Sequence, residues 1–596
     1  MIIKEKVKSE IHQMINHIKK NQSDDGSWKY CFESGPMTDA YMIIILRVLE
    51  YKEEDLIKAL VNRLLNTQQS NGAWRLYDDE SGNLSATVEA YTALLFSGYA
   101  DGSDNNMKKA ESFILKKGGL ENTHVSTKFM LALNDLYPWP YFFPFPLFMM
   151  NKIHSYKLSS YVKAHLAPIL ILGHHKPSFR NQWTPDLSHL FSISKKRKRK
   201  SKRIYSISKF LAKPAIKKAE SYMLKGIEAD GTLFSYASAT FFMIYAFLAL
   251  GYDSHSRHLQ NAVAGLKSLL FKIDEDCHIQ NSSSTIWDTA LFSYALQEAG
   301  LSIDDPAILS SAKYLLSFQK DYRTEGGWGF SENNSSLPDI DDTQAALRAI
   351  SRFTLDHNEY RKAWNAGVKW LLDMQNDDGG WGSFDKNTHQ SIITLLPIEN
   401  LKDTFIDPST ADLTGRTLEF FGNYLRLTIR HPRIESGVRW LIENQKDDGS
   451  WYGRWGVSYI YGTWAAVTGL KAVGVPSHHP AIQKAAEWIK NIQRSDGGWG
   501  ESCKSDQKRT FVPLTYSTIV QTSWAVDTLI SIYEKPTTEI EKGIDYILNR
   551  ENHPEKSLTY PMGAGLPGHF YIYYHSYPHI WPLLALSHYI DKIREF

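Results

Sequence analysis

The sequence predicts an all-α protein that consists of two α/α barrels, in each of which helical hairpins close into a ring. Three observations lead to this prediction: a repeated turn phrase, helical periodicity between the repeats, and a scarcity of strand-like alternation. The chain has 596 residues, of which 43% are hydrophobic and 22% are charged. A chain of this length and composition can form more than one hydrophobic core.

The repeated phrase is a helix that ends in Gln, followed by polar residues and then Gly-x-Trp. Asp-Gly and Asn-Gly favour tight turns because glycine accepts a positive φ. We expect the Gln to bond backbone groups at neighbouring helix ends and the Trp to cover it. The copies run from Gln22 to Trp28, Gln69 to Trp74, Gln319 to Trp328, Gln375 to Trp381, Gln445 to Trp451 and Gln493 to Trp499.

The spacing of the repeats fits one helical hairpin per copy. Trp451 and Trp499 are 48 residues apart, which accommodates two helices and their loops. Between them, residues 482–489 have the apolar spacing of a helix. The phrase is missing between Trp74 and Trp328. This gap predicts two helical domains rather than one continuous array.

Charge, cysteine content and apolar runs restrict the function classes. The formal net charge is +2, so no overall field attracts nucleic acid. The 3 cysteines are scattered, without a disulfide framework or paired zinc-ligand spacing. No apolar run reaches the ~20 residues that span a bilayer, and the first residues lack a signal-peptide core. We therefore expect a cytoplasmic protein that can lie on a membrane.

Two unusual stretches lie in the half without the repeats. Residues 195–203 are a dense basic run, best interpreted as a solvated loop. The alternative is contact with anionic lipid, which contributes ~1 kcal/mol per basic residue near such a surface. Residues 137–150 are rich in proline and aromatic side chains, and either line an apolar entrance or cover core.

Three carboxylates, Asp339, Asp341 and Asp342, lie between Pro338 and the helical run 344–350. An aspartate at the start of a helix caps free N–H groups and suits the positive end of the helix dipole, which explains one or two of the three. Carboxylates this close repel one another, so one of them can keep its proton above the usual pH range. Such an acid can protonate a very poor base.

The half of the chain that carries these acids is also rich in aromatic side chains. Any one of them alone is best explained as core. Together, beside glycine-rich turns, they predict a dry cavity in which π faces stabilise a carbocation by ~0.5–2 kcal/mol each. No glycine-rich phosphate loop occurs, and no second carboxylate cluster is present that could complete a magnesium site.

The repeats and the Asp-x-Asp-Asp motif together resemble the class II terpene cyclases of the squalene–hopene cyclase family. The resemblance covers nearly the whole chain, and further matching stretches are residues 287–290, 326–330, 412–419, 453–457, 459–462 and 566–570. It implies barrels of the type also found in protein prenyltransferases. Residues 1–30 and 283–596 are expected to form the catalytic barrel, and residues 31–282 an inserted second barrel.

The resemblance also implies how the protein works and where. The substrate would be a polyprenyl hydrocarbon, and the reaction would need neither a metal nor an organic cofactor. The protein would be monotopic on the inner face of the cell membrane. A homodimer is expected on the same basis.

By this resemblance Asp341 is the proton donor, and Asp339 and Asp342 flank it. Arg416 stands where the family has a histidine bonded to the donor, and an arginine stays cationic and donates in a fixed geometry. Asp412 is expected to orient Arg416, or alternatively to cap a helix. The implied substrate-binding aromatic residues are Tyr161, Trp287, Phe330, Phe384, Trp455, Tyr459, Phe570, Tyr574 and Tyr577.

Some of these positions depart from the family pattern. Phe384 stands where the family often has tyrosine, and Tyr161 where squalene cyclases have tryptophan. The sequence resembles one branch of the family, the tetraprenyl-β-curcumene cyclases, at Arg416 and at residues 410–415 and 83–87. Enzymes of that branch convert a C35 monocyclic polyprene to the pentacyclic alcohol sporulenol. We therefore expect that substrate, with cyclisation of squalene to hopene or hopanol as the alternative.

Three readings outside this family remain open. A protein prenyltransferase subunit would need a zinc site, and no convincing Asp, Cys and His trio is visible. An α/α-barrel carbohydrate enzyme would use two carboxylates, but this cluster is too tight in sequence for the usual pair. A membrane-bound lipid carrier would share the aromatic cavity without needing the acid.

Overall fold

The computed structural model describes residues 2–139, 160–192, 208–273, 276–319, 326–333, 337–388, 406–566 and 568–594. The side chains of residues 2, 160–163, 208–212, 566 and 594 lie outside this description. The basic run 195–203 and residues 140–150 of the aromatic stretch also lie outside it.

The chain divides into two compact units. Unit 1 contains residues 1–32, 157–160 and 283–596, and unit 2 contains residues 33–156 and 161–282. Both are predominantly helical, so the prediction of an all-α protein with two helical domains is confirmed.

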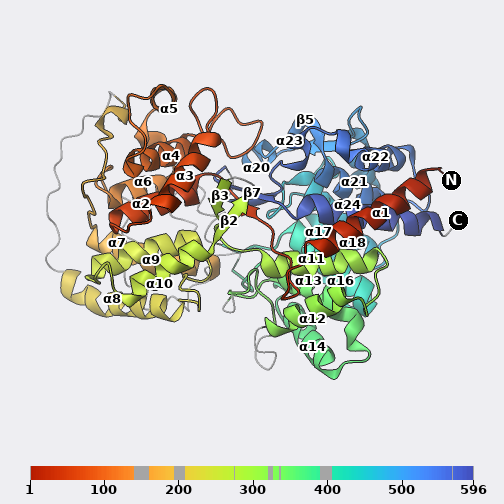
Figure 1. The fold of residues 1–596 in the computed structure, drawn as a ribbon. Coiled ribbons are helices and arrows are strands. Elements are labelled where there is room, and N and C mark those ends of the chain that lie inside the picture. Colours follow the sequence, from red (N-terminus) through yellow and green to blue (C-terminus); the bar gives the residue numbers. More distant parts are fainter. Residues whose placement is uncertain are drawn as a thin grey trace. The chain divides into compact units, whose positions relative to one another are not determined.

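A closed ring of helices forms the inside of unit 1. Its members are α11 (Thr285–Glu298), α13 (Ile340–Ile350), α16 (Ala411–Leu425), α18 (Tyr459–Ala472), α21 (Ile519–Ile532) and α24 (Tyr577–Arg594). Each packs against the next, and α24 packs against α11, which closes the ring (Figure 1). Thirteen consecutive residues of α11, Thr285 to Gln297, are buried, as expected for a helix surrounded on all sides.

An outer layer of helices covers this ring. It consists of α1 (Ile2–Lys20), α12 (Pro306–Ser317), α14 (Asn358–Asp373), α17 (Pro432–Glu443), α19 (Pro480–Asn491) and α22 (Thr538–Leu548). These helices are amphipathic: α14 buries Tyr360, Ala363, Gly367 and Leu371, at helical spacing. Figure 1 shows α1 beside α24, against which it packs, so the first residues of the chain complete the last part of the barrel.

The glutamine of each repeat joins its own turn to the next outer helix. Gln375 Nε2 donates to the carbonyl oxygens of Gly379 and Arg433, both at 2.7 Å. Gly379 has a φ of +95°, which explains why the turn needs glycine. The same pair of bonds is made by Gln22, Gln319, Gln445 and Gln493.

In the second repeat the bonding glutamine is Gln68, and the prediction of Gln69 was wrong. Gln68 Nε2 donates to Gly72 O at 2.9 Å and to Asn106 O at 3.2 Å. The reason is spacing, because Gln68 precedes Trp74 by six residues, the same separation as in the first repeat.

The tryptophan of each repeat joins the turn to both helix layers. Trp381 Nε1 donates to Leu371 O of the outer helix at 2.8 Å, and its backbone N–H donates to Thr414 Oγ1 of the inner helix at 3.0 Å. All six repeat tryptophans are at most 1% exposed. The backbone N–H groups of the others bond Thr289, Thr87, Thr343, Thr463 and Thr522.

A related turn lies in unit 2 between Trp74 and Trp328, where the sequence phrase is missing. The Leu233 N–H donates to Thr240 Oγ1 at 2.8 Å, as the tryptophan N–H does in the repeats. Gly231 precedes it with a φ of +96°, and Asp230 accepts a bond from the Thr232 N–H at 2.8 Å. Leucine therefore replaces tryptophan in a turn of the same design.

Unit 2 contains a second set of helices. They are α2 (Met37–Val48), α3 (Glu54–Asn66), α4 (Leu84–Ser97), α5 (Asn105–Lys116), α6 (Val125–Leu133), α7 (Ser160–His175), α8 (Ser208–Lys225), α9 (Ala237–Leu250) and α10 (Arg257–Ser268). Helices α9, α2, α4 and α6 pack in succession, and α3, α5 and α10 pack on this row. A hairpin of β2 (Leu270–Ile273) and β3 (Asp276–Ile279) follows.

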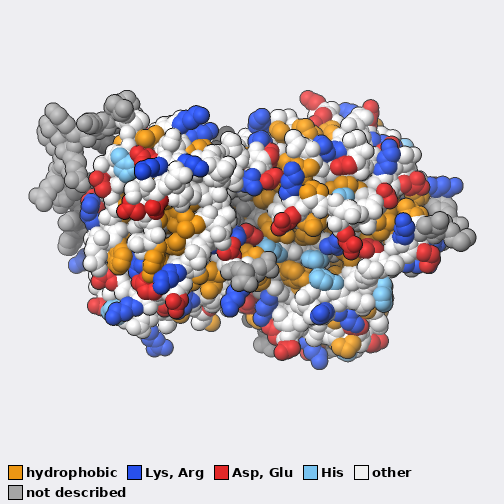
Figure 2. Space-filling view, turned by 45° about the horizontal axis from the view of Figure 1, so that its top comes forward, with side chains coloured by type: hydrophobic (Ala, Val, Ile, Leu, Met, Phe, Trp, Pro, Cys, Tyr) orange, Lys and Arg blue, Asp and Glu red, His pale blue; other side chains and the backbone are white. Residues whose placement is uncertain are grey.

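Short strands and surface features complete the description. In unit 1, β4 (Trp499–Glu501) pairs with β5 (Pro513–Thr518), and β7 (Phe570–Tyr574) lies between β6 (Gly563–Leu566) and β1 (Phe32–Glu33). No helix among the described residues is long and apolar enough to cross a membrane. On the face shown in Figure 2, charged side chains of both signs are interspersed over the described residues.

The neighbouring glutamines Gln68 and Gln69 provide a test of the turn. Gln68→Met should lower the free energy of unfolding by about 1–2 kcal/mol, because two carbonyl oxygens lose their donor. Gln69→Met is the matched control and should leave stability within about 0.5 kcal/mol. Thermal unfolding of both variants measures the difference, and equal midpoints would contradict the assignment of Gln68.

Candidate active site

The acid cluster forms the start of α13. Asp339 is the N-cap, and its Oδ1 accepts a bond from the Asp342 N–H at 2.8 Å. The Asp339 N–H in turn donates to Trp328 O at 3.0 Å, which ties the cap to the preceding repeat turn. Asp341 and Asp342 therefore lie inside the first turn of the helix, which begins earlier than the run predicted from residue 344.

The three carboxylates have different environments. Asp339 and Asp342 are 6% and 2% exposed, whereas the side chain of Asp341 is 18% exposed. Burial, together with the charge of Asp341, raises the pKa of Asp339 to about 6. Burial and the charge of Asp339 raise the pKa of Asp342 well above its usual range. Burial therefore favours the neutral form of Asp342, which reduces the negative charge beside Asp341.

One oxygen of Asp341 has both a hydrogen-bond donor and a cation beside it. Gln344 Nε2 donates to Asp341 Oδ1 at 2.9 Å, and Arg416 Nε lies 3.0 Å from the same oxygen. Among the described residues, Asp341 Oδ2 has no hydrogen-bond partner. The predicted contact between Arg416 and Asp341 is present, and Gln344 adds to it.

Three indole rings surround Arg416. Its guanidinium carbon lies 5.2 Å from the ring centre of Trp287 and 5.5 Å from those of Trp464 and Trp581. Arg416 is 3% exposed. Burial lowers the pKa of Arg416, but the charge of Asp341 outweighs this and the net direction is upward. A planar cation suits such a cage because it stacks on aromatic faces.

Asp412 contacts backbone groups ahead of α18. Its Oδ2 accepts bonds from the N–H groups of Arg454 at 3.0 Å and Trp455 at 2.9 Å. No hydrogen bond between Asp412 and Arg416 is present among the described residues, in contrast to the expectation that Asp412 orients Arg416. Asp412 instead positions Trp455, whose ring centre lies 6.0 Å from that of Phe384.

The predicted residues of α11 and the β7–α24 segment come together. The rings of Tyr574 and Tyr577 stack at 4.2 Å, and Trp287 Nε1 donates to the Tyr577 hydroxyl at 3.2 Å. Asp288 tethers the same segment, because it accepts a bond from Ser576 Oγ at 2.6 Å. The segment is therefore fixed to α11 at two points.

Phe32, which the sequence analysis did not single out, links the remaining rings. Its centre lies 5.2 Å from those of Phe330 and Tyr574 and 6.4 Å from that of Phe570. Phe32 begins β1, which pairs with β7. A residue near the start of the chain therefore belongs to the aromatic cluster of the catalytic half.

One predicted aromatic residue, Tyr459, remains outside these clusters. The ring of Tyr459 contacts Tyr452 at 5.7 Å, and no ring contact with another predicted residue is described. Tyr461, rather than Tyr459, lies near the acid. Burial and the charge of Asp341 raise the pKa of Tyr461 well above its usual range. The side chain of Tyr161 lies outside the described residues.

Comparison with known proteins decides the family. The models for the squalene-hopene cyclase N-terminal and C-terminal domains match residues 11–275 and 283–591. The chain belongs to the squalene–hopene cyclase family. Its Asp-x-Asp-Asp motif, its family and the two relatives described next together show that it is a class II polyprene cyclase.

Two curated relatives span nearly the same length as this cyclase. It is 44% identical to sporulenol synthase of Bacillus subtilis, over 100% of this chain and 99% of that protein. It is 31% identical to squalene–hopene cyclase of Alicyclobacillus acidocaldarius, over 98% and 97% of the two chains. The solved structure of ent-copalyl diphosphate synthase from Streptomyces platensis shares the fold, with a TM-score of 0.54 at 16% identity over 98% and 99%.

Several site residues of the cyclase were missed at first, although helical spacing points to them. Gln344 follows Asp341 by three residues, and Trp581 follows Tyr577 by four. Residues three or four apart lie on the same face of a helix, so each lies beside a recognised residue. Such a search requires knowing which helix face points inward.

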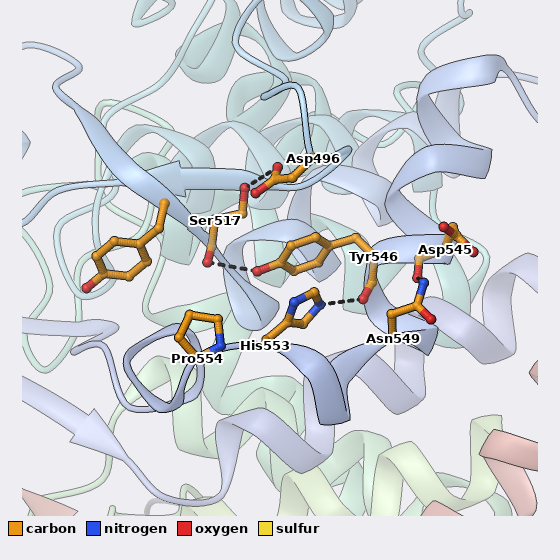
Figure 3. A pocket seen from close by; sticks show the side chains of 8 residues that line it. Asp496, Ser517, Asp545, Tyr546, Asn549, His553 and Pro554 are labelled. Carbon is orange, nitrogen blue, oxygen red and sulfur yellow. Dashed lines mark hydrogen bonds between the residues drawn. The ribbon is translucent and has the colours of Figure 1, made fainter.

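Other polar features of the cyclase lie apart from this site. Within the part of the chain that the structure describes, no group of three or more His, Cys, Asp or Glu side chains is placed to hold a metal ion. A cavity of about 270 Å³ lies near α22, and its lining includes none of the site residues above (Figure 3). There His553 stacks on Tyr546 at 3.8 Å, and the Tyr546 hydroxyl donates to Ser517 O at 2.8 Å.

Buried Asp288 predicts a pH-dependent stability. Burial raises its pKa from 3.8 to about 7, so the folded chain holds this proton more tightly than the unfolded chain. The stabilising contribution of the proton is complete below about pH 4 and is lost as the pH rises through 7. Asp288→Asn cannot ionise and should show a smaller fall in thermal midpoint between pH 5 and pH 8 than the parent.

The exposed Asp377 provides the control for this measurement. Asp377→Asn should show the same fall in midpoint as the parent protein. If Asp288→Asn also shows the parental fall, the carboxyl at Asp288 does not carry the effect.

Proposed function

We propose that Asp341 starts the reaction by protonating a terminal alkene of a polyprenyl hydrocarbon. The observation that carries this proposal is the position of Asp341, partly exposed between two buried carboxyl groups and against the cationic Arg416. The alkene π electrons form the new C–H bond, and a tertiary carbocation remains. Arg416 stabilises the carboxylate that Asp341 leaves behind. Asp342, whose neutral form is favoured by burial, limits the negative charge beside the donor, and Asp339 fixes the first turn of α13.

Aromatic rings then stabilise the positive charge as the rings of the product close. Trp287, Tyr574 and Tyr577 supply π faces in unit 1, and Phe330, Phe384, Trp455 and Phe570 extend this lining. Each face contributes ~0.5–2 kcal/mol to a nearby cation. Loss of a proton or addition of water ends the sequence. The rings also keep water away from the earlier cations.

The substrate that we propose is tetraprenyl-β-curcumene, and the product is sporulenol. The 44% identity to sporulenol synthase over the full length supports this choice. The contact between Arg416 and Asp341 supports it as well, because arginine at this position resembles that branch of the family. The second candidate is cyclisation of squalene, supported by the 31% identity to a squalene–hopene cyclase.

We also propose that the cyclase works as a monotopic protein at the inner face of the cell membrane. A C35 hydrocarbon dissolves in the bilayer core rather than in water, so the enzyme has to reach its substrate at that surface. A homodimer stays a prediction from the family resemblance.

Product analysis tests the substrate and the reaction. Detergent-solubilised enzyme receives tetraprenyl-β-curcumene or squalene in separate reactions with EDTA, and extracts are read by mass spectrometry. A pentacyclic alcohol from the C35 substrate is expected. Cyclic products from squalene alone would overturn the substrate choice, and no product from either would overturn the proposed reaction.

Asp341→Asn tests the proton donor. Because an amide cannot protonate an alkene, product formation should fall by at least about a thousandfold, while the thermal midpoint stays near that of the parent. Asp377→Asn is the exposed control and should keep full activity. Full turnover by Asp341→Asn would show that another group supplies the proton.

A further inference from the structure

A buried glutamine connects the acid to a second pair of charges. Gln344 is completely buried, and its Nε2 donates to both Asp341 Oδ1 and Asp341 O at 2.9 Å. Both residues lie on α13, three positions apart, so the helix itself sets this contact. Neither the sequence motif nor the roles proposed above include Gln344.

Arg348 fixes which way the amide of Gln344 faces. Arg348 Nε donates to Gln344 Oε1 at 2.6 Å, and Arg348 is 3% exposed. An arginine carries donors only and stays protonated, so the amide oxygen has to face it. The amide nitrogen is then left to face Asp341. The hydrogen bond to Asp341 therefore runs in one direction only, from Gln344 to the carboxyl.

Arg348 is itself held from the neighbouring helix. Its two terminal nitrogens lie 3.1 and 3.3 Å from the carboxylate oxygens of Glu419, and one of them donates to Arg416 O at 2.8 Å. Glu419 and Arg416 both belong to α16. The same helix thus supplies the cation beside Asp341 and, through Arg348, supports the hydrogen-bond donor Gln344.

We propose that Gln344 is a positioning residue which, with Arg416, assigns the transferable proton of Asp341 to Oδ2. The Gln344 N–H donates to Oδ1, and Nε of the cationic Arg416 lies 3.0 Å from the same oxygen. A carbonyl oxygen accepts a hydrogen bond better than a protonated oxygen does, and a nearby cation disfavours a proton on that oxygen. Oδ1 is therefore the carbonyl-like oxygen of the acid, and Oδ2 is the oxygen that gives the proton to the alkene. This inference rests on the proposed role of Asp341 as donor.

The effect of Gln344 should appear in the chemical step. Rotation of the carboxyl about its side-chain bond would move Oδ2 away from the alkene, and a displacement of about 1 Å at a reacting group can lower a rate by about a hundredfold. Substrate binding depends on the aromatic lining, which Gln344 does not form. Loss of Gln344 should therefore lower kcat and leave KM nearly unchanged.

Two substitutions separate the hydrogen bond from packing. Gln344→Met keeps the length of the side chain and removes both polar atoms. Gln344→Glu keeps an acceptor for Arg348 but, when ionised, donates nothing to Asp341. Both should lower kcat by about 10- to 100-fold with KM within about threefold of the parent. Gln344→Glu also answers the question if Gln344→Met fails to fold.

Gln297 provides the matched control. It is a 3% exposed glutamine of α11 in the same barrel, and its Nε2 donates to Ala349 O at 2.8 Å. Gln297→Met removes a buried amide without touching the acid, so kcat and KM should stay within about twofold of the parent. Thermal midpoints of all variants show that each is folded under the assay conditions.

The outcomes distinguish this inference from the proposed function. If Asp341→Asn is inactive while both Gln344 variants keep the parental kcat, the positioning role is wrong and the proton donor stands. If Gln344→Met raises KM alone, or loses no more kcat than Gln297→Met, the role is structural and the inference is overturned. If Asp341→Asn is active, the donor assignment itself fails.

Discussion

One hydrogen bond recurs at the start of the inner helices of unit 1, and the candidate site depends on it. The backbone N–H of a repeat tryptophan donates to a threonine hydroxyl near the start of an inner helix. Thr343 directly follows Asp342, and Thr414 lies between Asp412 and Arg416. Because these residues lie within two positions of an anchored threonine, the turns that stabilise the barrel also fix where its functional groups lie.

How far the sequence predicts this protein depends on the kind of contact. The glycine and tryptophan of each turn have a local physical cause, so the all-α fold and most of the turns could be predicted. The turn at Leu233 could not, because its tryptophan is replaced and only the backbone bond to Thr240 preserves the design. A glutamine that ends a helix is likewise recognised only when its spacing from the tryptophan is counted, as with Gln68.

The candidate site shows the same difference between residues that a local motif identifies and contacts that only the fold creates. Asp341 and Arg416 belong to motifs, and the structure brings them within 3.0 Å of each other. Tyr459 and Tyr461 cannot be told apart without the phase of α18, since two residues differ by about 200° around a helix. Asp412 bonds backbone groups more than forty positions away along the chain, which no local pattern indicates.

Two pairs of opposite charges lie inside unit 1. Arg348 contacts Glu419, and His588 Nδ1 lies 2.6 Å from Asp527 Oδ1. Asp527 also accepts a bond from Trp464 Nε1 at 2.8 Å, and Trp464 is one of the rings around Arg416. Removing one member of such a pair leaves the other charge buried and uncompensated, at a cost of about 3–5 kcal/mol. Substitutions here therefore affect stability as well as catalysis.

The arrangement around Oδ1 of Asp341 has a consequence for the catalytic cycle. Neither an amide nor a guanidinium gives up a proton at physiological pH, so neither Gln344 nor Arg416 can reprotonate the carboxylate of Asp341. In the proposed mechanism the proton has to return to Oδ2, from the side that the hydrocarbon occupies. Water can reach that side only after the product has left. Product release would then limit the rate of turnover, and a hydrocarbon that stays bound would leave Asp341 deprotonated and the enzyme inactive.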